Sequence, residues 1–496
     1  MSATPAIYLD YAATTPVDPL VARAMSECLT REGDFGNAAS AHAYGHAAAT
    51  RVAQARAQVA ALLGAAPQEI YFTSGATEAN NLAILGAARA QADRPPHLVT
   101  LRTEHKAVLD CCRHLERVGA RVTYLTPDRD GLLSVAALAA ALRPETVLVS
   151  VMQANNETGV LQDIGALAAL CRERGVALHC DGAQSAARVA VDVHALGVDF
   201  FSLTAHKLYG PKGIGALYVR QGARALLQPL LFGGGQERGL RPGTLPVHQI
   251  VGFGAACELA QRALPAEALR LAALDAQLWR GLAQLPGVHL NGARAPRAPG
   301  IQNVSFEHVE GESLVSALPE LALATGAACN SASGEPSYVL RALGRDARLA
   351  ESSLRFSLGR YTTAAELEQA VAAVRAAVER LRALSPACEL PPVAGRAVSG
   401  EAGAQGEGTW VRFQLLLEGD NVKEARFKAF ACPHTVHTAR WLCQQLRGRT
   451  RADLIPGTPA QWARACAVPV EKLGRLLVIE DALRACLTRW TEGATM

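Results

Sequence analysis

The pattern of apolar and polar positions divides the chain into three parts. Over residues 17–260, short apolar runs alternate with Ala-, Leu- and Arg-rich stretches of helical period. This alternation of strands and helices predicts a mostly parallel sheet covered on both faces, with ligands binding at the carboxyl ends of its strands. Seven strands are predicted, at 70–73, 98–101, 121–124, 147–151, 176–180, 200–203 and 215–219.

Residues 261–385 carry a second pattern, which predicts a smaller α/β unit. A long Ala-, Leu- and Arg-rich helix opens it, a strand is expected near 301–306, and a helix is expected after Thr363. Together with residues 1–16, this segment is the predicted small domain, and residues 17–260 are the predicted large domain.

The composition of the chain changes after this unit. Residues 385–408 read SPACELPPVAGRAVSGEAGAQGEG and show no period, so residues 386–408 are predicted to be a linker. An apolar stretch at 410–417 then predicts a strand, and at least two helices follow. Residues 409–496 are therefore expected to form a separate small α+β domain.

Composition and charge narrow the class of protein. Half of the 496 residues are apolar, which is enough to bury a large core. The net charge of +4 is spread along the chain and requires neither nucleic acid nor an anionic membrane as a partner. We see no signal peptide and no apolar run near the roughly 20 residues of a membrane span, so we expect a cytoplasmic protein. Twelve irregularly spaced cysteines then predict free thiols, most of them small core residues.

Lysine is rare in this chain, which limits the amines available for covalent chemistry. A Schiff base needs an amine that can lose its proton and attack a carbonyl, a task for which arginine is not equivalent. Nearly all basic residues are arginine, and the first 400 residues offer only Lys106, Lys207 and Lys212.

A carboxylate and a lysine follow two of the predicted strands. Asp181 comes directly after the strand at 176–180, and Lys207 follows the strand at 200–203. A pyridoxal cofactor requires both, because the carboxylate keeps its pyridine nitrogen protonated and the lysine binds it as an imine. Taken alone, such a pair is more often a surface lysine and an incidental aspartate.

A third element makes the pattern specific. Residues 71–81, YFTSGATEANN, leave a predicted strand, turn at Gly75 and enter a helix. Free amides and hydroxyls at such a helix start bind phosphate, although a plain helix cap has the same appearance. A phosphate cup, an aspartate and a lysine in one array of strands and helices together favour a pyridoxal-phosphate site.

Eight motifs occur in the order of one known family. SGATEAN, TEHKAVLD, NNETG, DGAQ, the His206-Lys207 pair, RPGTLP, GAACNSAS and LRFSLGR resemble the motifs of the NifS/IscS cysteine desulfurases, which are class-V aminotransferases. The resemblance covers residues 6–385. It implies fold type I of the pyridoxal-phosphate enzymes, with a mostly parallel seven-stranded sheet and a smaller α/β domain. It also implies a homodimer that holds pyridoxal 5'-phosphate, acts on L-cysteine and hands sulfur to acceptor proteins such as an iron–sulfur scaffold.

The resemblance implies catalytic roles for Lys207 and His105 in this domain, and a cofactor-binding role for Asp181. Lys207 holds the cofactor as an imine, Asp181 pairs with its pyridine nitrogen, and His105 stacks on its ring and takes part in proton transfer. Lys212 is the nearest competitor of Lys207, whose flanking residues favour it, and Lys106 is expected to point away from the site.

The remaining matches imply binding roles. Gln184 bonds the phenolate oxygen of the cofactor. Asn155, also counted among the cofactor-binding residues, forms with Arg355 a clamp on the substrate carboxylate, which suits a guanidinium fork. The residues implied to hold the phosphate are Ala76, Thr77, Thr204 and His206, together with Thr244, which reaches it from the partner subunit.

Sulfur transfer needs an exposed thiolate, and Cys329 has the most suitable context. The segment from 325 to 336, TGAACNSASGEP, has little that could anchor it in a core and predicts an exposed, mobile loop, while the other cysteines lie in helical, strand or linker contexts. A loop cysteine without a role is the plain alternative. The resemblance implies that Cys329 attacks the substrate Sγ, takes the sulfur as a persulfide and leaves L-alanine. It also allows Cys329 as a transient ligand of an iron–sulfur cluster, and no metal site is otherwise expected.

Two other functions stay open at this point. A selenocysteine lyase, or another pyridoxal-phosphate lyase or aminotransferase of this fold, shares the cofactor residues, although an aminotransferase has no need of Cys329. For the C-terminal residues 409–496, the alternative is a module that binds other sulfur-transfer proteins.

The C-terminal part has a weaker resemblance of its own. VKEARFKAFAC, ending at Cys432, and IEDA near the end resemble the IscU/NifU scaffold on which iron–sulfur clusters are built. That scaffold uses three cysteines with a nearby His and Asp, but here Glu407, Thr409 and the pair Gly474-Arg475 stand at the other ligand positions. One thiol does not hold a cluster that needs four ligands. We therefore predict a degenerate scaffold-like domain whose histidines near Cys432 are solvated, with Cys432 as a less favoured second sulfur acceptor.

Overall fold

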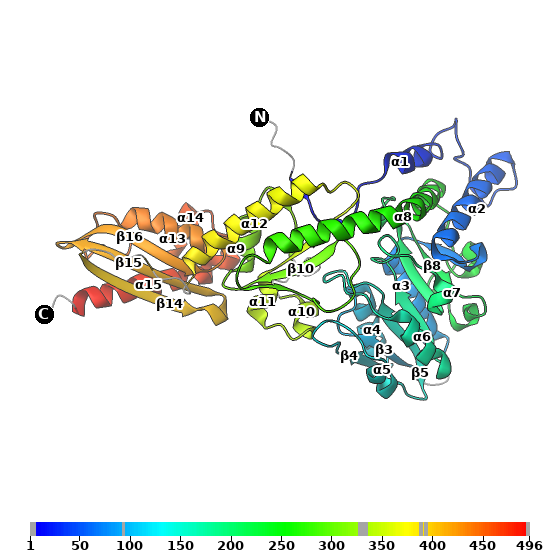
Figure 1. The fold of residues 1–496 in the computed structure, drawn as a ribbon, viewed down its shortest axis with the longest axis horizontal. Helices are drawn as coiled ribbons and strands as arrows, with labels where there is room; N and C mark the ends of the chain where they lie inside the picture. Colours follow the sequence, from blue (N-terminus) through cyan, green and yellow to red (C-terminus); the bar gives the residue numbers. More distant parts are fainter. Residues whose placement is uncertain (1–5, 92–94, 326–335, 386–389, 391–394, 493–496) are drawn as a thin grey trace.

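The computed structural model describes residues 6–91, 95–325, 336–385, 390 and 395–492 of the chain. The molecule is elongated (Figure 1). A large sheet with its helices lies at one end, residues 396–492 form a unit at the other end, and a smaller sheet lies between them.

The large sheet contains all seven strands predicted from the sequence, each within one residue of its predicted ends. Its order is β2-β8-β7-β6-β5-β3-β4. Strand β8 runs antiparallel to both of its neighbours, and the other neighbouring pairs are parallel. The strands are β2 Ile70–Thr73, β3 His97–Leu101, β4 Arg121–Leu125, β5 Thr146–Met152, β6 Ala177–Asp181, β7 Phe200–Thr204 and β8 Gly215–Val219.

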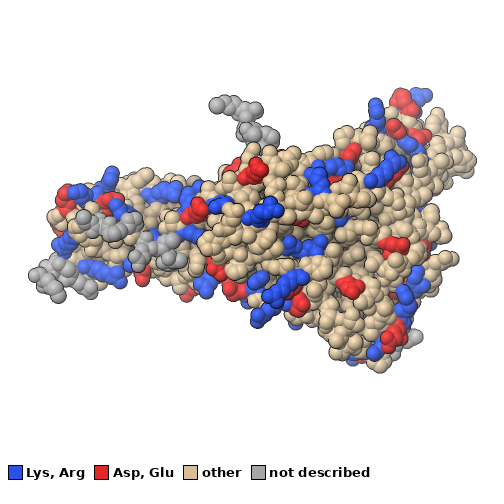
Figure 2. Space-filling view, in the orientation of Figure 1, with Lys and Arg blue, Asp and Glu red and all other residues tan. Residues whose placement is uncertain are grey.

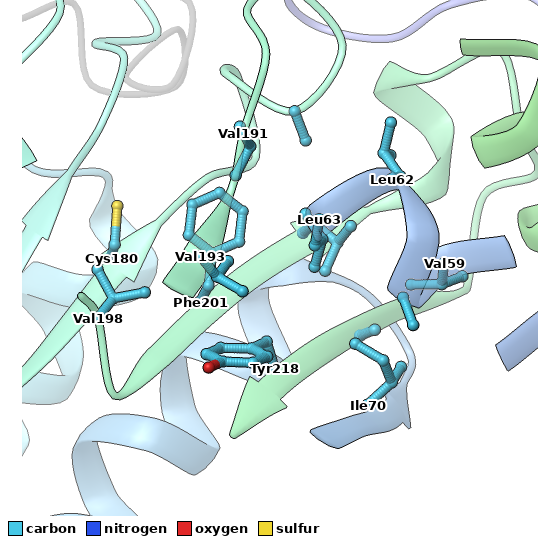
Figure 3. Close-up of a cluster of buried hydrophobic side chains, with 14 of the residues drawn as sticks. Val59, Leu62, Leu63, Ile70, Cys180, Val191, Val193, Val198, Phe201 and Tyr218 are labelled. Carbon is cyan, nitrogen blue, oxygen red and sulfur yellow. The ribbon is translucent and has the colours of Figure 1, made fainter. Parts of the chain in front are cut away.

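Helices cover both faces of this sheet. Successive side chains of a strand point to opposite faces, so Phe200 and Phe201 lie in two different cores. In the core shown in Figure 3, Phe201 and Tyr218 from the sheet lie near Leu63 and Val59 of a covering helix. The helices are α2 Ala43–Leu63, α3 Ala76–Arg89, α4 Lys106–Arg117, α5 Val135–Ala141, α6 Ile164–Glu173 and α7 Val193–Leu196, preceded by α1 Pro19–Ser26.

The smaller unit is built on a four-stranded antiparallel sheet in the order β12-β13-β10-β9. The predicted strand at 301–306 is confirmed as β10, and the predicted helix after Thr363 is α12, which that threonine caps. The predicted boundary at residue 260 falls inside α8, because this helix continues from one core into the next. The elements are β1 Ile7–Tyr8, α8 Val247–Leu282, β9 Val288–Leu290, β10 Ile301–Phe306, α9 Gly311–Ser316, β11 Leu321–Ala322, β12 Ala324–Thr325, α10 Tyr338–Ala342, α11 Ala347–Glu351, β13 Ser353–Ser357 and α12 Ala364–Leu384.

The C-terminal unit corrects one prediction. Part of the predicted linker 386–408 is a strand, β14, which pairs along its length with β15. Its glycines and alanines lack the apolar alternation that identifies a strand. Packing requires glycine at position 400, because a Cβ there would overlap the backbone of the helix that covers the strand. The elements are β14 Arg396–Ala404, β15 Thr409–Glu418, β16 Asn421–Phe430, α13 Pro433–Leu446, α14 Pro459–Ala465 and α15 Leu473–Glu492.

The surface and the cysteines agree with the composition. Figure 2 shows basic and acidic side chains intermixed over the visible face. Among the described helices, none is both long enough and apolar enough to cross a membrane. The ten cysteines in the described part of the chain are all free and eight of them are buried, which confirms for these residues the prediction of core thiols.

Candidate active site

A cavity of about 550 Å³ opens at the carboxyl ends of β5, β6 and β7. This is the edge at which ligands bind in open α/β sheets. Part of its wall comes from the smaller unit, through Arg355 on β13. The predicted site residues that line it are Ala76, Thr77, His105, Asp181, Gln184, Thr204, His206, Lys207 and Arg355.

The aspartate at this edge is held in a fixed direction. Asp181 is the last residue of β6 and is 6% exposed. One of its oxygens, Oδ1, accepts a hydrogen bond of 2.9 Å from the Ala183 amide, and Oδ2 accepts one of 2.7 Å from Asn80 Nδ2. Two hydrogen bonds from different elements fix the orientation of this carboxylate. Asp181 is therefore suited to hold a positive charge inside the cavity.

Two of the three candidate lysines line the cavity. Lys207 lies half-buried in the short turn Ala205–Lys207 that follows β7. Lys212 also lines the cavity but is exposed. Lys106 lines a different cavity, on another side of His105. The half-buried position of Lys207, beside the end of β7, favours it over Lys212 as the reactive amine.

The histidine of the TEHK motif faces the cavity in its neutral form. His105 caps α4, and its Nδ1 accepts a 3.1 Å hydrogen bond from the Ala107 amide. Burial, together with the charge of Lys207, lowers the pKa of His105 although Asp181 opposes this. Because Nδ1 is an acceptor, the proton of the neutral ring lies on Nε2. His105 therefore offers an N–H donor and a flat ring to a ligand.

The turn that the sequence predicts to be a phosphate cup lies at the start of α3. Gly75 caps this helix with a φ of +153°, a conformation open to glycine, and Ala76 is the first helical residue. Opposite the turn, Thr204 ends β7, and a Cβ on Gly75 would lie 3.7 Å from its Oγ1. His206 lies beside them, and burial with the charges of Lys207 and Lys212 lowers its pKa to about 4. Amides at a helix start and neutral polar side chains form a site for an anion.

Arg355 on β13 places a positive charge on the side of the cavity that the smaller unit forms. It is 3% exposed, and its Nη2 forms a 2.7 Å ion pair with Asp10 Oδ1. Its Nη1 donates to the Asn156 carbonyl at 2.9 Å, while its buried Nε has no partner among the described residues. The guanidinium is thus oriented before any ligand arrives, which suits recognition of a carboxylate.

The structure does not bring the predicted Asn155 to the cavity. Its Oδ1 accepts from the amides of Glu157 and Thr158, and its Nδ2 donates to the Thr103 carbonyl. Asn155 therefore closes a turn, as asparagine often does. The next residue, Asn156, lines the cavity instead, and its buried Oδ1 has no partner in the described part of the chain.

Thr244 and Cys329 are the two remaining predicted site residues. Thr244 is exposed and does not line this cavity, and Cys329 lies outside the described residues. Sequence reasoning also missed Asn80, which lines the cavity and holds Asp181. It is the last residue of the quoted SGATEAN motif, so its place in the first turns of α3 was the available signal.

The sequence matches known proteins over this whole region. Residues 7–370 match the family Aminotransferase class-V. Over 381 residues the chain is 54% identical to the "Cysteine desulfurase IscS" of Tolumonas auensis, which covers 77% of this chain and 94% of that relative. The chain belongs to the IscS-type class-V aminotransferases. It is also 53% identical over 385 residues to the Escherichia coli protein of the same name, with 77% of this chain and 95% of the relative covered.

Solved structures agree with this family. A "NIFS-LIKE PROTEIN" superposes with a TM-score of 0.69 at 34% identity, covering 76% of this chain and 99% of its own. The structure titled "SspA in complex with cysteine" superposes with a TM-score of 0.65 at 38% identity, covering 72% and 100%. The expected fold of the desulfurase part is therefore confirmed. The family match ends at residue 370, before the C-terminal unit begins.

A buried histidine beneath the site makes the stability of this family member depend on pH. His179 on β6 is fully buried between the hydroxyls of Ser150 and Ser202, and burial lowers its pKa to about 4. The unfolded chain, with an ordinary histidine, binds this proton already near pH 6.5. The free energy of unfolding therefore falls as the pH drops from about 6.5 to 4, by about 3 kcal/mol for this one group.

We expect this loss to depend on His179 itself. Thermal midpoints of the wild type should fall between pH 7.5 and pH 5, and His179→Gln should make that fall smaller while lowering the midpoint at pH 7.5. The exposed His437 provides the matched control, since His437→Gln should keep the wild-type pH dependence. An unchanged slope in His179→Gln would contradict the assignment.

Proposed function

We propose that this protein is a pyridoxal-phosphate-dependent cysteine desulfurase that converts L-cysteine to L-alanine and takes the sulfur as a persulfide on Cys329. The observation that carries the proposal is the meeting of Asp181, Lys207 and the cup at Gly75 in one cavity of an IscS-type chain. The relatives are named as cysteine desulfurases, which supports L-cysteine as the substrate. The residues that line the cavity are of the types that this reaction needs.

The residues fit the cofactor that the family uses. Asp181 is buried, and its two hydrogen bonds hold its carboxylate in a fixed direction, so it would pair with the pyridine nitrogen of the cofactor. The cup at Ala76, with Thr204 across from it, offers amides and a hydroxyl to a phosphate. Asn80 also presents a buried Oδ1 that has no partner among the described residues. When bound, pyridoxal phosphate withdraws electrons from the Cα of an attached amino acid.

The chain's own groups then supply binding and proton transfer. The Arg355 guanidinium holds the substrate carboxylate through its remaining donor capacity. The amine of Lys207 takes the proton from Cα and returns it at the end of the reaction. The neutral ring of His105 stacks in the cavity and offers its Nε2 proton.

Sulfur transfer balances without a further oxidant or reductant. The Cys329 thiolate attacks the substrate Sγ, the Sγ–Cβ bond breaks, and its electron pair stays with the carbon fragment. Protonation of that fragment gives L-alanine, while Cys329 carries the sulfur as a persulfide. A selenocysteine lyase or an aminotransferase of this fold shares the cavity, so the effect of removing Cys329 decides between them.

The proposed enzyme is a homodimer. A monomer would leave several large apolar side chains in water, among them Phe232, which is 84% exposed. Exposed apolar groups of this size are typical of protein interfaces. Thr244 follows on the same loop and is exposed, as required of a residue that serves a second subunit. Other exposed apolar side chains lie close to Phe232 in sequence, namely Leu226 and Leu231, or on and between the N-terminal helices α1 and α2, namely Leu20, Leu29, Phe35 and Tyr44.

The C-terminal unit is proposed as a degenerate IscU-like domain that acts in protein interaction. Cys432 is fully buried, with its Sγ 3.3 Å from Thr435 Oγ1, which disfavours it as a sulfur acceptor. The Arg475 guanidinium bonds the same thiol, so a positive charge stands where the scaffold would hold a cluster. Among the described residues, no three His, Cys, Asp or Glu side chains gather to hold a metal.

This unit is attached to α9 of the smaller unit. Lys472 Nζ bonds both carboxylate oxygens of Glu312, at 2.7 and 2.8 Å, and Ser313 Oγ donates to the Ala431 carbonyl at 2.8 Å. The contact places the tail beside the desulfurase and outside the cavity. The IscS relatives align over 94–95% of their own length, so they have no counterpart of this size.

We expect deletion of residues 391–496 to separate the two roles. The rate of alanine formation should stay within about twofold of the wild type, because the tail adds nothing to the cavity. Sulfur transfer from the loaded enzyme to an acceptor protein should fall. The charge reversal Lys472→Glu in the full chain is the matched variant. If the wild type and the deletion variant transfer sulfur to the acceptor protein at equal rates, the proposed interaction role of the C-terminal unit is wrong.

A further inference from the structure

The loop that carries Thr244 is built as a fixed arm. We call residues 235–246 the Thr244 arm. Glu237 and Leu240 turn inward and are buried, while Gly243 and Thr244 are exposed. Thr244 does not line the cavity of its own chain, so the arm presents this side chain outward.

The base of the arm is pinned to the strand that leads to the phosphate cup. Glu237 is 5% exposed, and its carboxylate accepts hydrogen bonds of 2.6 and 2.8 Å from Arg56 and one of 2.7 Å from the Phe72 amide on β2. Glu237 and Arg238 have left-handed φ angles of 49° and 54°, which non-glycine residues adopt at a cost. The bonds of Glu237 hold the backbone in this conformation.

The outer part of the arm is tied to the cup itself. Arg241 donates from Nε to Glu78 Oε1 at 2.8 Å and from Nη2 to Glu78 Oε2 at 3.2 Å. Glu78 belongs to the first turn of α3, and its Oε2 also accepts a 2.6 Å hydrogen bond from the Ser74 amide of the cup. Burial opposes ionisation, but the bonds from Arg241 and Ser74 lower the pKa of Glu78. Glu78 therefore connects the cup to the arm three residues before Thr244.

We propose that the Glu78–Arg241 ion pair is a positioning device that fixes Thr244 for the phosphate cup of a second copy of this chain. The inference rests on the proposed homodimer. A bidentate guanidinium–carboxylate contact fixes direction as well as distance, and a single-residue arm tip needs such a brace to bind a partner's phosphate. Glu78 belongs to the phosphate cup of its own subunit, while the Thr244 that it positions serves the cup of the other subunit. The two cups of the dimer are therefore coupled.

The proposal predicts an effect of Arg241→Ala on the opposite subunit. Two differently tagged chains are co-expressed and the mixed dimers are isolated through both tags.

In the first mixed dimer, one subunit is wild type and the other carries Lys207→Ala with Arg241→Ala. The wild-type subunit has the only lysine-bound cofactor and an intact ion pair of its own, but it receives Thr244 from an unbraced arm. In the second, one subunit carries only Arg241→Ala and the other only Lys207→Ala, so the active cup receives Thr244 from a braced arm.

The measurement is the rate at which the visible band of lysine-bound cofactor is lost when excess apoenzyme traps what is released. The first mixed dimer should lose it about five- to tenfold faster than a wild-type and Lys207→Ala reference dimer. The second should lose it more slowly than the first. The proposal is overturned if the first mixed dimer releases its cofactor as slowly as the reference dimer. It is also overturned if only the second mixed dimer shows faster release, because the ion pair would then serve only the cup of its own subunit.

Two controls keep this result separate from other failures. Arg220→Ala removes a comparable ion pair, with Asp199, that lies outside the cavity, and it should leave the release rate unchanged in either arrangement. Arg241→Lys keeps the charge without the fork and should give an intermediate rate. A wild-type chain that is monomeric, or has no visible band, would disprove the proposed function rather than this coupling.

Discussion

Replacing Lys207 by alanine is expected to remove both the visible band of the bound cofactor, at about 400–420 nm, and the formation of alanine from cysteine. The half-buried amine of Lys207 is the group that lies at the end of β7 inside the cavity. In the proposed mechanism this amine is needed twice, to bind the cofactor and to move the Cα proton, so the rate should fall by about 10³-fold or more. Absorption spectra and alanine assays of the purified variant measure the two effects.

Lys212 supplies the matched control for this experiment. It lines the same cavity and follows Lys207 by only a few residues, but it is exposed. Lys212→Ala should therefore keep the visible band. If the band persists in Lys207→Ala, or is lost only in Lys212→Ala, the cofactor is not bound by Lys207. Either result would contradict the proposed role of Lys207.

Replacing Cys329 by alanine is expected to have the second large effect, and a different one. The cavity keeps Lys207 and Asp181, so the visible band should remain and should still respond to added cysteine. Sulfur has no acceptor, however, and both alanine and persulfide should fall by about 10³-fold. Alanine production is measured with persulfide labelling of the protein in the same samples.

Cys432 provides the comparison for Cys329. Its thiol is fully buried in the C-terminal unit, so Cys432→Ser should leave alanine formation unchanged and should not alter sulfur delivery to any acceptor. Full alanine production in Cys329→Ala would disprove the desulfurase mechanism and favour a lyase or aminotransferase that does not use this thiol. Reduced delivery in Cys432→Ser would restore Cys432 as a second acceptor.

The two asparagines of the NNETG motif mark a limit of sequence reasoning. The motif identified the segment, but it did not distinguish the side chain that closes the turn from the one that faces the cavity. The three-dimensional turn decides this, because Asn155 satisfies two amides of its own loop while Asn156 is left to line the site. The choice depends on the backbone path, which a motif does not contain.

The strand β14 marks a second limit. Its Ala- and Gly-rich sequence has little of the apolar alternation that identified the other strands. Gly400 belongs there because the helix above it approaches the backbone closely, and that approach exists only in the folded unit. Composition alone therefore predicted a linker where the tertiary structure has an edge strand.

By itself, the sequence determined the features that depend on neighbouring residues. The apolar runs located the seven strands of the large sheet, and the strand-end positions of Asp181 and Lys207 located two side chains that line one cavity. Only the tertiary structure decided which distant side chains meet. Asn80 holds Asp181 across 101 positions, and Glu78 braces Arg241 across 163, because sheet order and helix packing bring these segments together. Local patterns do not encode such pairings, since the contacts form between elements that the chain connects only through its fold.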